Sequence, residues 1–200
     1  MDYSNYRKSR DLSWQILIDT NITQLPVKVS SICKNLGIPV ISYEKGHQII
    51  KTAGLEEICS QSDGITFMGS IFYNQECSIG RQRFTIAHEL GHILMHTESK
   101  YNREPSSDDP FIEQQANIFA GRLLAPACVL WGLGVTTAEQ MCQICDISPT
   151  SAKFRMERLN ALYEREKIFI KERGRSCFLL SPSEEKVYGQ FSHYIKTFKL

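Results

Sequence analysis

Two segments with a helical spacing of apolar residues, joined by a polar loop, constrain the fold of this 200-residue chain most strongly. The first segment runs from Ser78, a residue type that caps helices, to His96, and its apolar residues recur every three or four positions. The second begins near Pro110 and ends at about Leu124. The polar residues 99–110 between them contain two prolines and predict a loop. We therefore expect the second helix to fold back onto the first.

The first helix carries the pentapeptide His88-Glu89-Leu90-Gly91-His92. Side chains four residues apart lie on one face of a helix, about one turn apart, so the two imidazoles can coordinate one metal ion. Glu89 is next to the first ligand in the sequence and can act on a water molecule at the metal instead of binding the metal. The same pentapeptide also occurs on solvated helix faces without a function, so its context has to support this interpretation.

A catalytic zinc site needs a third protein ligand and leaves a position for water. Glu113, near the start of the second helix, is the best candidate, and Asn117 on the same face could orient a ligating imidazole. His96 is a further four residues along the first helix, which carries it a turn beyond the ion, so a flanking position is favoured over a ligand role. The sequence therefore predicts a zinc site formed by the ligands His88, His92 and Glu113 and the general base Glu89.

Composition limits the other classes of protein that the chain can belong to. A hydrophobic fraction of 42% and a charged fraction of 22% are typical of a folded globular protein. A net charge of +1 gives no basic surface for nucleic acid or membranes. The sequence has no apolar run of about 18 residues and no signal-peptide pattern. Its seven cysteines are irregularly spaced, so we expect a reduced protein in the cytoplasm.

Shorter segments fill the rest of the chain. Cys142 and Cys145 have the spacing of a zinc or redox pair, but no second pair follows, so ordinary thiols are favoured. The other elements expected before the two helices of the site are helices at about 9–20 and 26–36, with Pro26 opening and Gly37 closing the latter, a strand at 38–43, and two short strands in 64–74 around a Gly69-Ser70 turn. Those expected after it are two helices on either side of Asp146-Ile147-Ser148, a strand near 176–180 and an amphipathic stretch near 182–196.

The sequence RQRFTIAHELGH, which ends at His92, is followed by EQQANIFA from Glu113 and LLAP ending at Pro126. These motifs resemble the ImmA/IrrE family of metallopeptidases, and looser similarity covers residues 10–165. The resemblance implies an α+β fold, compact and zincin-like (gluzincin-type), with a small antiparallel sheet packed on the HExxH helix. It assigns the same zinc ligands and the same base. Ala125 replaces a common methionine, which affects no catalytic residue.

The resemblance also implies a function. It indicates a zinc-dependent endopeptidase that cleaves a helix-turn-helix transcriptional repressor and so relieves repression, often encoded on a mobile genetic element or in a stress-response locus. The expected organisation is a peptidase domain at 1–165 with a C-terminal extension at 166–200. A strand near Ile71–Tyr73 is the expected edge for an extended substrate, and the 182–196 stretch is a further candidate contact.

In the predicted mechanism zinc activates water and polarises the scissile carbonyl, while Glu89 transfers the proton to the leaving amine. Three candidates remain as donors to the oxyanion: His96, Tyr101 and His193. An alternative class is a non-catalytic regulator with a structural zinc site, which binds DNA through residues 137–165 or sequesters a repressor. The basic residues there are interleaved with glutamates, so we expect no direct nucleic-acid partner.

Overall fold

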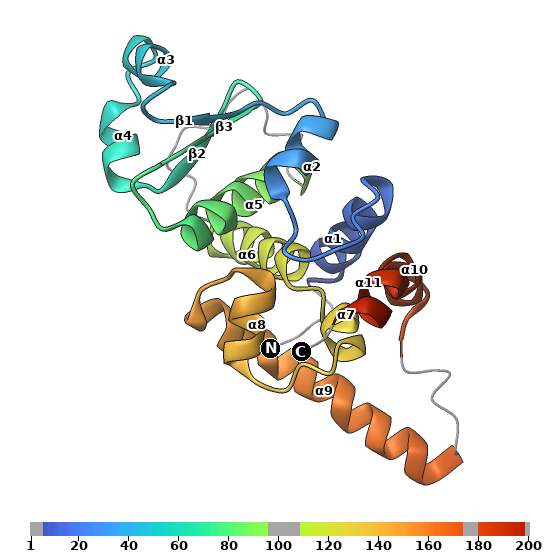
Figure 1. Ribbon diagram of the computed structural model, residues 1–200. Helices are drawn as coiled ribbons and strands as arrows, with labels where there is room; N and C mark the ends of the chain where they lie inside the picture. Colours follow the sequence, from blue (N-terminus) through green and yellow to red (C-terminus); the bar gives the residue numbers. More distant parts are fainter. Residues whose placement is uncertain (1–5, 96–108, 174–179, 199–200) are drawn as a thin grey trace. The chain divides into compact units, whose positions relative to one another are not determined.

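The computed structural model describes residues 6–95, 109–173 and 180–198 (Figure 1). The chain divides into two compact units, Met1–Ser9 with Lys28–Ala120 and Arg10–Val27 with Gly121–Leu200. The expected end of the peptidase domain at residue 165 stays a prediction. Within the described ranges, no helix is long and apolar enough to cross a membrane.

The first unit contains a small sheet and the helices around it. Its elements are α2 (Val29–Asn35), β1 (Val40–Ser42), α3 (His47–Thr52), α4 (Glu56–Gln61), β2 (Gly64–Phe67), β3 (Ser70–Tyr73), α5 (Ile79–Met95) and most of α6 (Pro110–Leu124). Helix α2 begins three residues after Pro26, because Lys28 still has non-helical backbone angles (φ −84°, ψ 84°). The short helices α3 and α4 were not expected from the sequence.

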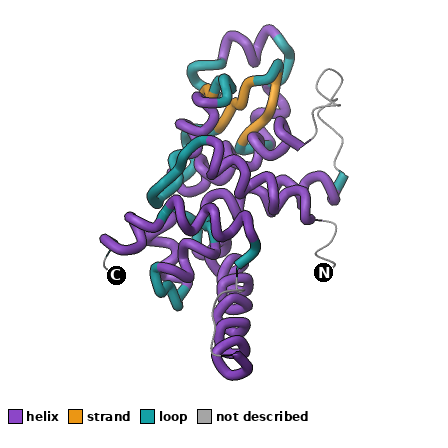
Figure 2. The backbone as a smooth tube through the Cα atoms, turned by 90° about the vertical axis from the view of Figure 1, so that its right-hand side faces the viewer, coloured by secondary structure: helices purple, strands orange, loops and turns teal. Residues whose placement is uncertain are grey.

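The strands, orange in Figure 2, form one sheet. Their order is β1-β3-β2, so β3 is the central strand. Strand β2 pairs with β3 antiparallel, whereas β1 pairs with β3 parallel. The sheet is therefore mixed, and the expectation of a wholly antiparallel sheet is wrong in this respect. The chain leaves β1 through α3 and α4, and this crossover lets β3 run in the same direction as β1.

The turn between β2 and β3 lies one residue earlier than expected. Its central residues are Met68 (φ +48°) and Gly69 (φ +72°), and Ser70 already belongs to β3. Two positive φ angles define the type of two-residue turn whose twist matches that of the flanking strands. The hairpin register follows from this turn, with Thr66 opposite Ile71 and Phe67 opposite Ser70.

Helix α5 packs against β2 and β3 and lies beneath the sheet in Figure 1. The Oγ atom of Ser78 accepts a hydrogen bond from the Arg81 amide at 3.4 Å, so Ser78 caps the helix as expected. Ala87 and Leu90 of the helix are fully buried, as is Ile71 of β3. A mainly helical chain with one small sheet on the HExxH helix confirms the α+β class.

The regular secondary structure among the described residues of the second unit consists of helices joined by turns and loops. Besides the C-terminal end of α6 it contains most of α1 (Arg7–Asp19), α7 (Ala127–Gly132), α8 (Ala138–Cys145), α9 (Pro149–Arg173), α10 (Pro182–Gln190) and α11 (Ser192–Thr197). Helix α9 continues past residue 165, the expected end of the peptidase domain, and α10 and α11 account for the amphipathic stretch. The strand expected near 176–180 lies, apart from Leu180, outside the described residues.

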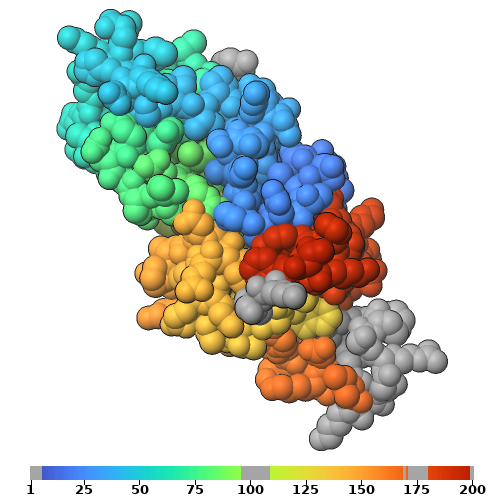
Figure 3. Space-filling model, in the orientation of Figure 1, coloured from blue at the N-terminus to red at the C-terminus, as the bar shows by residue number. Residues whose placement is uncertain are grey.

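Helices α10 and α11 (red in Figure 3) lie beside α7 (yellow). The rings of Trp131 and Tyr188 are 5.8 Å apart, and the amide of Gln190 donates to the carbonyl oxygens of Leu17 and Ile22 at 2.8 and 2.5 Å. Phe191 is fully buried. The C-terminal helices are thus part of the core of the second unit.

Candidate metal centre

Two helices that cross closely build the centre. Helix α5 carries both histidines, and α6 carries the glutamate. At the crossing, a Cβ atom on Gly91 would lie 2.9 Å from Cδ1 of Phe119 and 3.4 Å from the Cα atom of Ala116. The absence of a side chain at Gly91 therefore permits the close approach that brings Glu113 to the histidines.

The three predicted ligands converge on one point. Nε2 of His88 lies 3.2 Å from Oε2 of Glu113, and Nε2 of His92 lies 3.1 Å from Oε1 of Glu113. The two Nε2 atoms are 2.9 Å apart. Any two ligand atoms of a tetrahedral zinc site are about 3.4 Å apart, so the spacing and the donor types both fit zinc. In the described part of the chain, these residues are the one group of three or more that could hold a metal ion.

Asn117 orients the first histidine. Its Oδ1 atom lies 3.0 Å from Nδ1 of His88, and because this oxygen can only accept a hydrogen bond, it favours the tautomer with the proton on Nδ1. The lone pair of Nε2 then faces the other ligands. Burial alone lowers the pKa of His88, but the hydrogen bond with Glu113, the charges of Glu89 and Glu113 and the bond with Asn117 raise it overall. At acidic pH, protons therefore compete with a metal for Nε2 of His88.

The carboxylate of Glu89 borders the same site. It is half-buried, and its Oε2 atom accepts a hydrogen bond of 2.7 Å from the hydroxyl of Thr66 on β2. A hollow of about 270 Å³ opens here. Its lining consists of Ser62, Asp63, Gly64, Arg81, Phe84, Thr85, His88, Glu89, Glu113 and Asn117. A water molecule or a peptide group in this hollow can therefore contact the metal ligands and Glu89 together.

An ion pair forms part of the wall of this hollow. Nε and Nη2 of Arg81 both lie 2.5 Å from Oδ2 of Asp63, and the thiol of Cys77 donates to Oδ1 of Asp63 at 3.3 Å. The hydrogen bond from Arg81 is the largest effect on the pKa of Asp63 and lowers it, against burial and together with the Cys77 bond. Asp63 is thus held as a carboxylate at the mouth of the site.

The structure brings the predicted ligands and Asn117 together, but it corrects the expected substrate edge. The segment Ile71–Tyr73 belongs to β3, which is paired on both sides, whereas β2 is the edge strand beside Glu89. Strand order depends on pairing between distant segments, which the sequence pattern does not reveal. Among the oxyanion candidates, His96 and Tyr101 lie outside the described residues, and His193 lies in α11 of the second unit.

Thr66 is a residue of the site that the sequence pattern does not predict, because it is 23 residues before Glu89 in the chain. No motif signals a hydroxyl that reaches a carboxylate across two elements. Cys142 and Cys145 belong to no group of three or more metal-binding side chains among the described residues.

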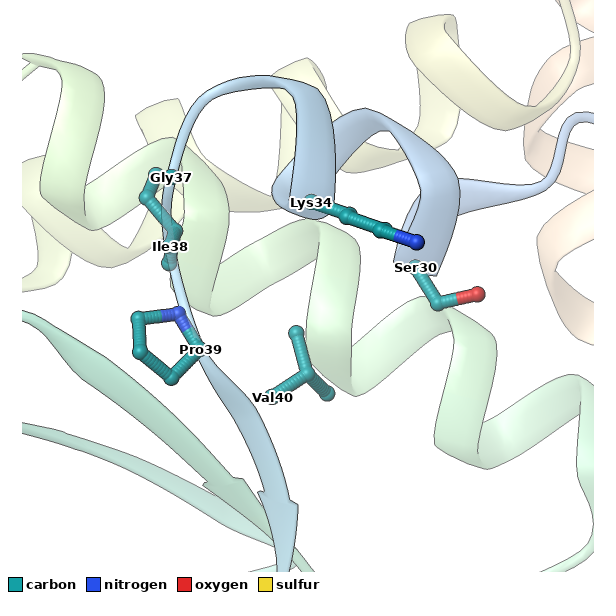
Figure 4. Close-up of a pocket in the computed structure, with 6 residues that line it drawn as sticks. All are labelled: Ser30, Lys34, Gly37, Ile38, Pro39 and Val40. Carbon is teal, nitrogen blue, oxygen red and sulfur yellow. The ribbon is translucent and has the colours of Figure 1, made fainter.

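A second hollow of about 380 Å³ lies between α2 and β1 (Figure 4). Its lining consists of Ser30, Lys34, Gly37, Ile38, Pro39 and Val40. Lys34 is the one ionisable side chain in that lining, so this hollow has no pair of acid and base groups and no metal ligands.

A comparison with protein-family models gives a match to the part of the chain that carries this site. The family model described as the IrrE N-terminal-like domain, a peptidase family, matches residues 33–132. This range covers half of the chain and includes the HExxH helix and Glu113. A comparison with curated proteins found no significant match.

Proposed function

Because the chain belongs to the peptidase family of the IrrE N-terminal-like domain, we propose that it is a zinc-dependent endopeptidase that hydrolyses a peptide bond in a partner protein. The observation that carries the proposal is the convergence of His88, His92 and Glu113 beside the carboxylate of Glu89. The proposed substrate is a helix-turn-helix transcriptional repressor, on the basis of the family resemblance. Its cleavage would relieve repression.

The proposed substrate position is along β2. Among the residues that the structure describes, this strand has a partner on one side only, and an extended peptide can add to such an edge through main-chain hydrogen bonds. The first residue of β2, Gly64, lines the same hollow as Glu89 and the two proposed ligands His88 and Glu113. A peptide paired with β2 would therefore pass the metal centre.

A zinc ion bound at this centre would supply Lewis-acid chemistry, that is, a lower pKa for its bound water and a polarised scissile carbonyl. His88, His92 and Glu113 would hold the ion, and Asn117 keeps the first imidazole in the tautomer that this requires. Glu89 accepts a proton from the water as the water oxygen bonds to the carbonyl carbon. It then delivers that proton to the amide nitrogen as the carbon–nitrogen bond breaks.

The alternative function is a DNA-binding or sequestering regulator without catalysis. Two basic residues of α9 are engaged within the protein, which disfavours DNA reading. Nε and Nη2 of Arg155 donate to the carbonyl oxygen of Ala125 at 3.1 and 2.7 Å, and Arg158 pairs with Glu184 at 3.2 Å. Burial and the charges of Arg122 and Arg158 lower the pKa of Arg155 to about 9. These side chains are unsuited to phosphate contacts.

The test of the proposed function separates metal binding from catalysis. Glu89→Gln keeps the size of the side chain but cannot accept a proton, so we expect one zinc per chain and no cleavage. Glu113→Ala should lose both zinc and cleavage. Zinc is measured by elemental analysis. Cleavage is measured by intact mass after incubation with candidate repressors, with and without a chelator.

The wild-type protein should cut a repressor only in the absence of chelator. Glu57→Gln on α4, an exposed glutamate, is the matched control and should behave as the wild type. Cleavage by Glu89→Gln at the wild-type rate would contradict the role of Glu89. A repressor that binds tightly but is never cut would instead favour sequestration.

A further inference from the structure

Resting on the proposed function, we propose that Thr66 is a positioning residue that holds the general base in place for catalysis. The hydroxyl of Thr66 donates to Oε2 of Glu89 at 2.7 Å, a short distance that is typical of a bond between a hydroxyl and a carboxylate. The bond joins β2 to α5, two elements far apart in the sequence. It therefore links β2, the proposed edge for the substrate, directly to the general base Glu89.

The pairing of β2 sets the position of the hydroxyl. Thr66 lies opposite Ile71 in the antiparallel register, and Ile71 is fully buried in the central strand. A shift by one residue would turn the Thr66 side chain to the other face of the sheet. The register therefore determines that a hydroxyl, and not the side chain of Ile65 or Phe67, faces Glu89.

Gly64 sets the distance between the strand and the helix. It lies two residues before Thr66 and so shares its face of the strand. A Cβ atom on Gly64 would lie 2.2 Å from Cγ2 of Thr85 and 3.4 Å from Cγ of Glu89. Thr85 is one turn before Glu89 on α5 and is buried. The missing side chain of Gly64 lets β2 approach α5 closely enough for the Thr66 bond to form.

The consequence is a fixed direction for the carboxylate. The glutamate side chain has three torsions. If the carboxylate must first rotate into its catalytic orientation, the chemical step is slower. Because Thr66 binds Oε2, the torsions of Glu89 are restricted and Oε1 points in one direction.

The kinetic test compares two substitutions at one position. Thr66→Val has nearly the same shape but no hydroxyl, and we expect kcat to fall about tenfold with little change in KM. Thr66→Ser keeps the hydroxyl and should restore most of kcat. Thr52→Val, on an exposed threonine of α3, is the matched control and should leave both constants unchanged.

A second measurement does not depend on activity. Crystal structures of the zinc-loaded wild-type, Thr66→Val and Thr66→Ser proteins should show Glu89 in one orientation in the first and third, and displaced or in several conformers in the second. Equal zinc content and thermal stability in all three would exclude a general structural effect. An unchanged Glu89 in Thr66→Val, or a loss of kcat that serine does not restore, would overturn the proposal.

The two proposals can fail separately. If the wild-type protein cuts no substrate, the proposed function is wrong, and the crystal structures still decide whether Thr66 orients Glu89. If the wild type is active and Thr66→Val is equally active, the proposed function stands and the role of Thr66 is wrong.

Discussion

The side chains at the metal centre have different roles, so the effect of removing one of them on zinc affinity depends on what it contacts. Asn117 contacts His88 and not the ion itself, because its Oδ1 atom lies on the Nδ1 side of the ring. We predict that Asn117→Ala lowers zinc affinity about 10- to 100-fold, since the imidazole loses the bond that sets its tautomer and orientation. The measurement is a competition titration with a chromophoric chelator.

Gln114→Ala is the control for Asn117→Ala, because Gln114 lies on the same helix and is not part of the lining of the site. It should leave zinc affinity unchanged. Equal affinities for the Asn117→Ala variant and the wild-type protein would show that the packing around His88 alone orients the ring.

At the scale of elements, the distance between α5 and α6 decides whether the ligands meet. Gly91→Ala would place a Cβ atom 2.9 Å from the Phe119 ring and 3.4 Å from the Cα atom of Ala116. The ring must move, or the helices must separate and carry Glu113 away from the histidines. We predict that zinc affinity falls about tenfold or more, equal to about 1.4 kcal/mol, as measured by the same competition titration.

Gly189→Ala is the matched control, because it also lies within a helix but its added Cβ atom would meet nothing within 4 Å. This substitution should leave zinc affinity unchanged and raise stability by up to about 1 kcal/mol through helix propensity. If Gly91→Ala binds zinc as tightly as the wild type, rotation of the Phe119 ring is enough to accommodate the methyl group.

At the scale of the whole molecule, the C-terminal helices pack into the core of the second unit. Helix α10 packs on α7, Phe191 is fully buried, and Nε1 of Trp131 donates to Glu166 at 3.0 Å. A fragment of residues 1–165 lacks all of these partners. We predict that its midpoint of thermal unfolding is lower by several degrees or that it aggregates, because the apolar surface of α7 becomes exposed.

The measurement is calorimetry of the fragment and of the full chain, both loaded with zinc. Lys186→Ala in the full chain removes an exposed side chain of α10 and should leave the unfolding midpoint unchanged. An unchanged midpoint for the fragment would support the expected organisation, in which residues 166–200 are an appended extension.

The sequence alone was enough to predict the parts of the site that depend on helix geometry. His88 and His92 lie four residues apart on one helix, and this periodicity places both imidazoles on one face whatever the rest of the fold does. The start of α6 before Glu113 and the capping of α5 by Ser78 also follow from local signals.

Only the tertiary structure decided which groups meet from different elements. The edge position of β2, the bond from Thr66 to Glu89 and the close approaches at Gly64 and Gly91 all depend on contacts between distant segments. A strand pattern shows which residues alternate, but its hydrogen-bonding partners are chosen by the packing of the whole sheet. A glycine in the sequence likewise does not show which neighbour would occupy the space of its missing side chain.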